Sequence, residues 1–223
     1  MSASGDQRRA RLAGARLYLV CGARPTGLDP TGFLHHALAG GVDVVQLRDK
    51  TADDQLLLAA AATFRRACSD AGALFIVNDR PEIAVAADAD GVHVGQDDVA
   101  VSDARDALGP DRLIGLSTHT AEQIDAGGRS GADYIAVGPV HATPTKPAYP
   151  AVGYGLVEYA AAHVALPWFA IGGIDPTNVP AVAAAGARRV VVVRAITGAQ
   201  DPAEAARALL TGLEHREVRV GAA

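Results

Sequence analysis

Short apolar runs alternate with longer amphipathic segments along almost the whole chain. The runs that predict strands are 16–21, 42–48, 74–77, 91–94, 113–116, 133–137, 168–171 and 189–193. Helical periodicity and turn residues between them predict helices, including 31–39, 51–72, 81–87, 101–108, 121–126 and 202–214. Thr51 is the predicted N-cap of the helix that ends near Gly72, and Ser117 is predicted to end the fifth strand. The pattern amounts to eight strands and eight helices.

A strand followed by a helix, repeated, requires parallel strands joined by right-handed crossovers. Eight such units close most simply into a single-domain (β/α)8 TIM barrel of the α/β class. A doubly wound open sheet is the second choice, but the GxGxxG fingerprint expected after its first strand is absent. The predicted barrel spans residues 15–215, between a poorly ordered N-terminal extension, 1–14, and a C-terminal tail, 216–223.

Composition narrows the function classes only slightly. Of the 223 residues, 49% are hydrophobic and 20% charged, which is typical of a folded chain, and the net charge of −5 gives no support to nucleic-acid binding. No apolar run approaches the ~20 residues of a membrane span, and the start has no secretory apolar region, so a cytoplasmic location is expected. Cys21 and Cys68 are predicted to be reduced packing residues.

A row of polar residues follows the second predicted strand. Gln46, Arg48 and Lys50 are spaced two apart, which places them on one strand face at intervals of ~6.6 Å. Of the 20 lysines and arginines, only Lys50 and Lys146 are lysines, and both follow apolar strand-like segments. Lysine is a mobile point charge suited to phosphate oxygens. The alternative is a strand that simply leaves the core into solvent.

Two aspartates are predicted to converge at the same end of the barrel. Asp79 and Asp98 follow neighbouring strands, and two carboxylates brought together repel unless a cation lies between them. Their oxygens suit Mg2+, which completes its shell with phosphate oxygens and water. With cations nearby, this arrangement favours a diphosphate ligand. The alternative is that both aspartates are helix caps.

A glycine pair follows the seventh predicted strand. Gly172 and Gly173 allow backbone N–H groups to approach an anion, and barrels commonly build a phosphate site after strands seven and eight. Two anion sites in one mouth suggest two phosphorylated substrates. The glycines would otherwise serve only tight turns.

Six ordered motifs carry a resemblance to a known family. They are QLRDK at 46–50, NDR at 78–80, GVHVGQDD at 91–98, GLSTHT at 115–120, GPVHATPTKP at 138–147 and AIGGI at 170–174. Together they resemble the thiamine phosphate synthase family, whose members are TIM barrels. These enzymes join hydroxymethylpyrimidine diphosphate to phosphorylated hydroxyethylthiazole, releasing pyrophosphate.

The resemblance implies a role for each matched residue. Gln46 and Ser117 are expected to hold the pyrimidine, and its diphosphate is expected to contact Arg48, Lys50, Asn78 and Lys146. Asp79 and Asp98 are expected to bind Mg2+, and the thiazole phosphate is expected at Thr143, Thr145 and Gly173. Charge on the departing diphosphate is then neutralised by Lys146, Arg48 and Lys50, the expected catalytic residues.

One position departs from the family pattern. Where members often have a serine after the eighth strand, this chain has Arg194. If backbone amides at Val193 and Arg194 hold the thiazole phosphate, the change is tolerable; if a serine hydroxyl is required, affinity falls. His93 and His119 are expected to serve structure or hydrogen bonding rather than catalysis, and the loop 144–155 is a candidate lid.

Other functions stay open. A thiazole tautomerase uses a similar barrel without a diphosphate site, and another phosphate-handling isomerase would require an acid/base pair that the strand ends do not offer. A non-catalytic binding protein that kept the pocket is the third alternative. Homo-oligomerisation is not decided by the sequence.

Overall fold

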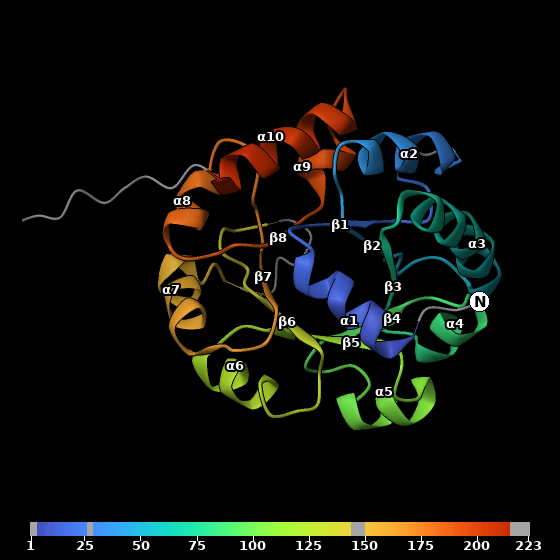
Figure 1. Ribbon diagram of the computed structural model, residues 1–223, viewed down its shortest axis with the longest axis horizontal. Helices are drawn as coiled ribbons and strands as arrows, with labels where there is room; N and C mark the ends of the chain where they lie inside the picture. Colours follow the sequence, from blue (N-terminus) through green and yellow to red (C-terminus); the bar gives the residue numbers. More distant parts are fainter. Residues whose placement is uncertain (1–3, 26–28, 144–149, 215–223) are drawn as a thin grey trace, which may run out of the picture.

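Eight parallel strands close into a barrel in the order β1 to β8, with β1 hydrogen-bonded to both β2 and β8 (Figure 1). This computed structural model describes residues 4–25, 29–143 and 150–214. The strands are β1 (Leu17–Cys21), β2 (Val44–Leu47), β3 (Leu74–Asn78), β4 (Gly91–Val94), β5 (Leu113–Thr118), β6 (Tyr134–Val137), β7 (Trp168–Ile171) and β8 (Val190–Val192). The expected TIM barrel is confirmed, and the open doubly wound sheet is wrong.

Most of the helices form a ring around the barrel, which Figure 1 shows from one end. They are α1 (Gly5–Gly14), α2 (Thr31–Ala39), α3 (Asp54–Ala71), α4 (Pro81–Ala86), α5 (Val101–Leu108), α6 (Ala121–Gly127), α7 (Gly153–His163), α8 (Val179–Ala184), α9 (Arg194–Thr197) and α10 (Pro202–Glu214). Within the described residues this makes ten helices instead of the expected eight, because α1 and the short α9 add to the repeating units. None of the helices in this part of the chain is long and apolar enough to cross a bilayer.

Residues 5–14 form helix α1, which corrects the expectation of a poorly ordered extension. Ser4 caps the helix: its side chain accepts a hydrogen bond from Gln7 N, and the Gln7 side chain accepts one from Ser4 N. The helix lies across one opening of the barrel (Figure 1). Its contacts explain why it is ordered despite its many arginines.

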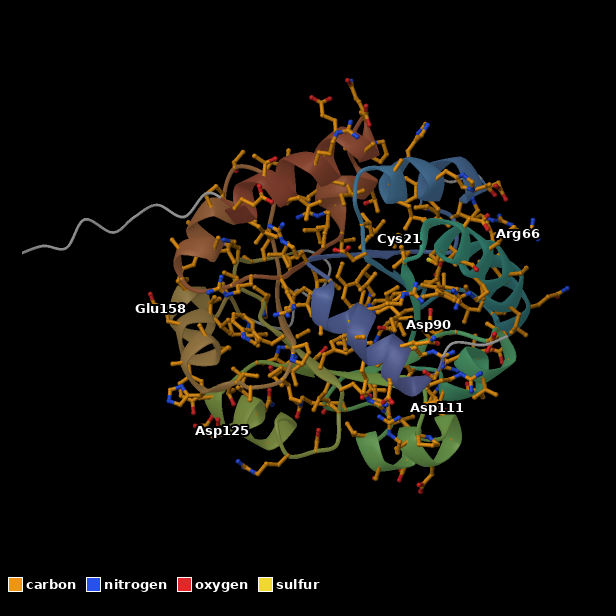
Figure 2. All side chains as sticks on the ribbon, viewed as in Figure 1. Cys21, Arg66, Asp90, Asp111, Asp125 and Glu158 are labelled. Carbon is orange, nitrogen blue, oxygen red and sulfur yellow. The ribbon has the colours of Figure 1, made fainter. Side chains whose placement is uncertain are left out.

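The contacts of α1 reach the loops that precede several strands. Arg8 Nε lies 3.0 Å from Asp90, just before β4, and Arg9 Nε lies 2.8 Å from Asp133, just before β6. Figure 2 shows the labelled Asp90 beside α1. Leu12 is buried and joins the apolar cluster inside the barrel. Helix α1 therefore closes the amino-terminal end of the strands and leaves the carboxyl ends for a site.

The apolar core has two parts. One cluster fills the space between the strands and the surrounding helices. The other fills the barrel interior and includes Tyr18, Tyr134 and Phe169. Both cysteines are free and buried, as expected, and burial raises the pKa of the Cys68 thiol to about 12.

Two expected boundaries are wrong. The N-cap of α3 is Asp53, whose side chain accepts a hydrogen bond of 2.8 Å from Leu56 N. Thr51 instead donates from its hydroxyl to Asp49, two residues earlier. Strand β5 continues past Leu116, so Ser117 lies inside the strand rather than ending it. That extension places the Ser117 side chain in the buried interior, where it is 7% exposed.

Candidate active site

A cavity of about 340 Å3 opens at the carboxyl ends of the strands, within the size range of small-molecule sites. Gln46 and Arg48 reach it from β2 and the turn that follows. The expected site residues that line it are Gln46, Arg48, Asn78, Ser117, Thr143, Gly173, Val193 and Arg194. Residues from six different strand ends or their loops therefore meet, as parallel strands in a closed barrel require.

Three further residues of the expected site, Lys50, Asp79 and Asp98, lie beside this cavity without lining it. Lys50 Nζ lies 3.4 Å from Oδ2 of Asp79, and the Asp79 carboxyl is within hydrogen-bonding contact of Asp98. Asp79 directly follows Asn78, which lines the cavity. The carboxylate pair and one ammonium group thus lie together, next to the pocket. Thr145 and Lys146 are outside the described residues, as is the first half, 144–149, of the candidate lid at 144–155.

The surroundings of the Asp79 carboxyl favour the binding of a cation there. Burial, reinforced by the neighbouring Asp98 carboxyl, raises the pKa of Asp79 above its usual value, although Lys50 opposes the rise. Asp79 also has a φ of 59°, a left-handed conformation that is uncommon for residues other than glycine. Its backbone N–H donates to His93 O at 2.8 Å, which ties this conformation to the neighbouring strand β4.

The position of Asp98 is set by its own turn. Asp98 Oδ2 accepts a hydrogen bond of 2.9 Å from Gly95 N, in the loop that follows β4. No group of three or more His, Cys, Asp or Glu side chains could share a metal among the described residues. Two carboxylates that need a compensating cation fit Mg2+, which takes one or two carboxylates and otherwise phosphate oxygens and water.

The glycine pair after β7 is held by the loop after β6 and by Asn178, which lies farther along its own loop. Gly172 and Gly173 have φ values of 108° and 61°, where side chains are strained. Gly172 O accepts a hydrogen bond of 3.0 Å from His141 N, and Gly173 O accepts one of 2.8 Å from the Asn178 side chain. A Cβ on Gly172 would lie 2.5 Å from Pro139 Cα. Both positions therefore require glycine for their backbone conformation and for space, whether or not they bind an anion.

A hydrogen-bonded chain of side chains crosses the barrel below the cavity. Gln46 Nε2 donates to Tyr18 Oη at 2.6 Å, and Tyr18 Oη lies 3.0 Å from Tyr134 Oη. Tyr134 Oη lies 3.2 Å from His93 Nδ1, and His93 Nε2 lies 3.0 Å from Ser117 Oγ. The two residues expected to hold the pyrimidine are thereby linked through three others.

The sequence reasoning missed Tyr18 and Tyr134 as site residues. Both lie on strands that the pattern predicted, and both side chains point inward, but their meeting depends on how β1 and β6 are placed across the barrel. The one available signal was a tyrosine hydroxyl at a buried strand position, which needs a polar partner. For His93, the expected hydrogen-bonding role is confirmed. Asp175 was also missed; it lines the cavity, and hydrogen bonds led by the Thr177 hydroxyl lower its pKa.

Comparison with known proteins identifies the family. The family model described as thiamine monophosphate synthase matches residues 17–196. The chain belongs to the thiamine monophosphate synthase family. A thiamine-phosphate synthase of Thermobifida fusca is 55% identical over 217 residues, which cover 96% of this chain and 98% of that protein.

Other relatives agree on the family and differ in length. A thiamine-phosphate synthase of Thermosynechococcus vestitus is 48% identical over 94% of this chain, but the match spans only 59% of that longer protein. Among solved structures, a thiamine phosphate pyrophosphorylase from Pyrococcus furiosus superposes with a TM-score of 0.83 at 30% identity, covering 92% of this chain and 97% of that one. The whole barrel is thus common to the family.

Proposed function

We propose that this chain is a thiamine-phosphate synthase. It joins 4-amino-2-methyl-5-hydroxymethylpyrimidine diphosphate to 4-methyl-5-(2-phosphoethyl)thiazole and releases pyrophosphate. Beyond family membership, one observation carries the proposal: Lys50, Asp79 and Asp98 lie together beside a cavity that Gln46 and Ser117 line. A carboxylate pair with adjacent cations suits a substrate that carries a metal-bound diphosphate.

The pyrimidine diphosphate is the substrate that this arrangement fits. Gln46 and Ser117 would contact the ring in the buried part of the cavity. Arg48, Lys50 and Asn78, with Lys146 from the loop after β6, would contact the diphosphate. Asp79 and Asp98 would hold Mg2+, which supplies positive charge to the diphosphate oxygens when bound.

Bond breaking needs a good leaving group and a stabilised carbon. The amino group of the pyrimidine donates electron density to the ring and its methylene, so the bond to the diphosphate can break and leave a delocalised cation. The thiazole nitrogen then attacks that carbon. No covalent enzyme nucleophile is required. Lys50 and Arg48 neutralise the charge that builds on the departing oxygen, and the buried cavity holds both rings in line.

The thiazole phosphate is assigned to the other side of the mouth. Thr143, Gly173, Val193 and Arg194 line the cavity there, and Thr145 is expected to join them. Arg194 stands where family members often have a serine. Its guanidinium adds a cation to this side of the cavity, which supports binding of a phosphate without the hydroxyl.

The decisive experiment measures pyrophosphate release. We expect release that requires both phosphorylated substrates and Mg2+, with loss of activity in Asp98→Asn. The matched control is Asp106→Asn, which removes an exposed carboxylate on α5. Isomerisation of the thiazole without pyrophosphate release would instead identify a tautomerase. Binding of either substrate without turnover would identify a non-catalytic barrel.

A further inference from the structure

Two charged residues of the matched motifs have no expected contact with a substrate. Asp49 lies between Arg48 and Lys50 in QLRDK, and Arg80 follows Asp79 in NDR. Each of the two is therefore next to a residue of the expected site. A charged side chain in such a place either faces solvent or supports the residue beside it, and its contacts show which.

The Asp49 carboxylate builds the turn that contains Lys50. Its Oδ1 accepts hydrogen bonds from the backbone N–H and the hydroxyl of Thr51, at 3.1 and 2.8 Å, and from Ala52 N at 3.2 Å. The bond from Thr51 N spans one residue, so Lys50 is the central residue of an Asx turn. Oδ2 accepts a bond of 3.3 Å from Ala23 N. Asp49 therefore fixes the course of the chain at Lys50 and joins it to the loop after β1.

The charge of Asp49 suits this role as an acceptor. Burial alone would raise the pKa of its carboxyl, but the hydrogen bonds that it accepts, led by the one from the Thr51 hydroxyl, lower the pKa below the usual aspartate value. The ionised side chain can accept all four hydrogen bonds. Alanine at this position would remove the partner of three backbone N–H groups, whereas asparagine would keep one of the two acceptor oxygens.

The Arg80 guanidinium joins the starts of two helices. Its Nη2 donates to both carboxylate oxygens of Asp54, the first residue of α3, at 2.9 and 3.0 Å. Its Nε donates to Glu82, in the first turn of α4. An isolated exposed ion pair restrains little, but here one guanidinium is shared by two carboxylates. The segment that carries Lys50 and the segment that carries Asp79 are therefore tied together at the helices that follow them.

The backbone of Arg80 also closes the turn around Asp79. Arg80 N donates to Asn78 O at 2.8 Å, so Asp79, with its φ of 59°, is the central residue of a three-residue turn. Lys50 and Asp79 are thus each held at the centre of a tight turn, and their side chains meet at 3.4 Å. Because the attraction within an exposed pair is weak, this contact depends on how the two turns are placed.

We propose that Asp49 and Arg80 are positioning residues that hold Lys50 beside Asp79 before a substrate arrives. Neither of them contacts the ligand itself. An ammonium group that is already in place loses less conformational entropy when it binds a phosphate oxygen, and a lysine side chain has more such entropy to lose than most. The role rests on the proposed function, because that function assigns the diphosphate to Lys50.

The first test needs no ligand. The chain has only two lysines, so labelling with 15N-lysine gives two backbone amide signals, and the Lys50 signal is assigned by its loss in Lys50→Ala. In wild-type protein we expect an order parameter of about 0.85 for this amide, the value of rigid backbone, and a fall toward about 0.6 in Asp49→Ala and in Arg80→Met. A mobile Lys50 amide in the wild type would overturn the proposal. An unchanged amide in either variant would remove that residue from it.

Two matched controls separate this role from a general loss of order. Arg16→Met breaks an ion pair with Glu214 at the other end of the barrel, where the side chains are 38% and 64% exposed, almost as for Arg80 and Asp54 at 38% and 61%. Asp201→Ala removes a carboxylate that accepts hydrogen bonds of 2.8 and 3.0 Å from two backbone N–H groups at the start of α10. Neither control is expected to change the order parameter.

The second test is a double-mutant cycle, measured by calorimetry with pyrophosphate and excess Mg2+ as the probe. Lys50→Ala is expected to weaken pyrophosphate binding about tenfold, the loss of one charge-assisted hydrogen bond. Asp49→Ala and Arg80→Met should each weaken it about three- to tenfold, the effect of ordering a side chain that is no longer held in place. In the Lys50→Ala background neither change should weaken binding further, because both act through Lys50. Asp49→Asn and Arg80→Lys, which keep part of the contacts, should lose less.

The outcomes separate this inference from the proposed function. If Asp49→Ala or Arg80→Met still weakens binding fully in the Lys50→Ala background, that residue acts on the ligand without Lys50, and its positioning role is refuted. A lower Tm with unchanged affinity would refute it as well, by showing a structural role alone.

A wild-type protein that neither binds nor releases pyrophosphate would refute the synthase. The order parameter of the Lys50 amide would then decide by itself whether Asp49 and Arg80 hold that residue. Should an alanine or methionine variant fail to fold, Asp49→Asn or Arg80→Lys takes its place in both tests, with a smaller loss expected.

Discussion

Lys50 Nζ faces Oδ2 of Asp79 at 3.4 Å, so the ammonium group that follows β2 meets the carboxylate that follows β3. The Lys50 side chain is 57% exposed, and the Asp79 side chain is 20% exposed. An exposed pair of this kind contributes little to stability. Under the proposed function, the ammonium group would turn from the carboxylate to the diphosphate of the arriving substrate.

Replacing Lys50 is therefore expected to affect turnover more than stability. Lys50→Ala should lower kcat by about 10- to 100-fold, somewhat less than the loss of a buried electrostatic contact, because solvent screens an exposed charge. Steady-state pyrophosphate release measures this, and thermal unfolding should show almost no change. Lys50→Arg, which keeps the charge, should lose less. A wild-type kcat in Lys50→Ala would remove Lys50 from the mechanism.

The second lysine gives a prediction that rests on the sequence alone. Lys146→Ala should lower turnover by roughly 10²- to 10³-fold, the effect of losing one preorganised electrostatic contact. The same assay measures it, at saturating concentrations of both substrates. Arg129→Ala, on the turn after α6, is a suitable control for loss of a surface cation. Turnover at the wild-type rate would mean that Lys146 does not contact the leaving group.

The carboxylate pair is expected to lower the stability of the metal-free protein and to raise its stability when Mg2+ binds. Burial and Asp98 raise the pKa of Asp79, so the folded protein holds that proton more tightly than the unfolded chain does. This carboxyl consequently lowers the stability of the metal-free protein as pH rises from the usual aspartate pKa of 3.8 through the raised pKa of Asp79. At neutral pH, Asp98→Asn should raise the metal-free Tm by about 1–3 °C and abolish the gain in Tm on adding Mg2+.

Thermal unfolding across pH, with and without Mg2+, tests this. Asp106→Asn is the control, because it removes an exposed carboxylate far along α5 and should change neither value. A full Mg2+ response in Asp98→Asn would refute the metal site at this pair. A lower Tm for that variant without metal would refute the repulsion between the two carboxylates.

The sequence predicted those parts of the molecule that depend on local pattern. The repeating strand and helix segments predicted the barrel, because the apolar residues of each strand are enough to indicate that the strand is buried. Closure then brought Asp79 and Asp98 together without any knowledge of side-chain positions, since adjacent parallel strands end at the same edge. The same reasoning placed Gln46, Arg48 and Ser117 at one opening.

Long-range contacts account for what the sequence did not predict. The helix α1 is rich in arginine and looks like a solvated segment, but Arg8 pairs with Asp90, which lies 82 positions away. The meeting of Tyr18 with Tyr134 joins residues 116 positions apart across the barrel interior. Thr51 is not the N-cap for a local reason. Its hydroxyl donates to Asp49, and Asp53, directly before the helix, caps it instead.

Gly115 links the fold to the cavity and gives a further prediction. A Cβ there would collide with Tyr134 and His93, so Gly115→Ala should cost about 1–3 kcal/mol of unfolding free energy, the usual cost of overpacking. Urea unfolding measures it. Pyrimidine binding is expected to weaken as well, because the displaced imidazole of His93 is hydrogen-bonded to Ser117. For Gly14→Ala no atom lies within 4 Å of the added Cβ, so its stability should be nearly unchanged. Equal stability of both variants would contradict the predicted collision.

The opposite end of the barrel provides the last prediction. Arg8 and Asp90 are 3% and 2% exposed, and Asp90 also accepts hydrogen bonds of 2.9 Å from Arg65 and from Phe75 N. Arg8→Met keeps the length of the side chain but leaves the buried carboxylate with less compensation. The expected cost is about 3 kcal/mol of unfolding free energy, at the lower end for a broken buried pair, because Arg65 still contacts Asp90.

Urea unfolding of Arg8→Met and Arg9→Met compares the loss of a buried ion pair with the loss of an exposed ion pair on the same helix. Arg9 lies on the same helix and pairs with Asp133, but its side chain is 42% exposed, so its loss should cost no more than about 1 kcal/mol. The kcat of the folded Arg8→Met protein should stay at the wild-type value, since α1 covers the end of the strands remote from the cavity. Equal costs for the two variants would show that the buried pair does not anchor the helix. A reduced kcat in fully folded Arg8→Met would show that closing the amino-terminal end also shapes the site at the other.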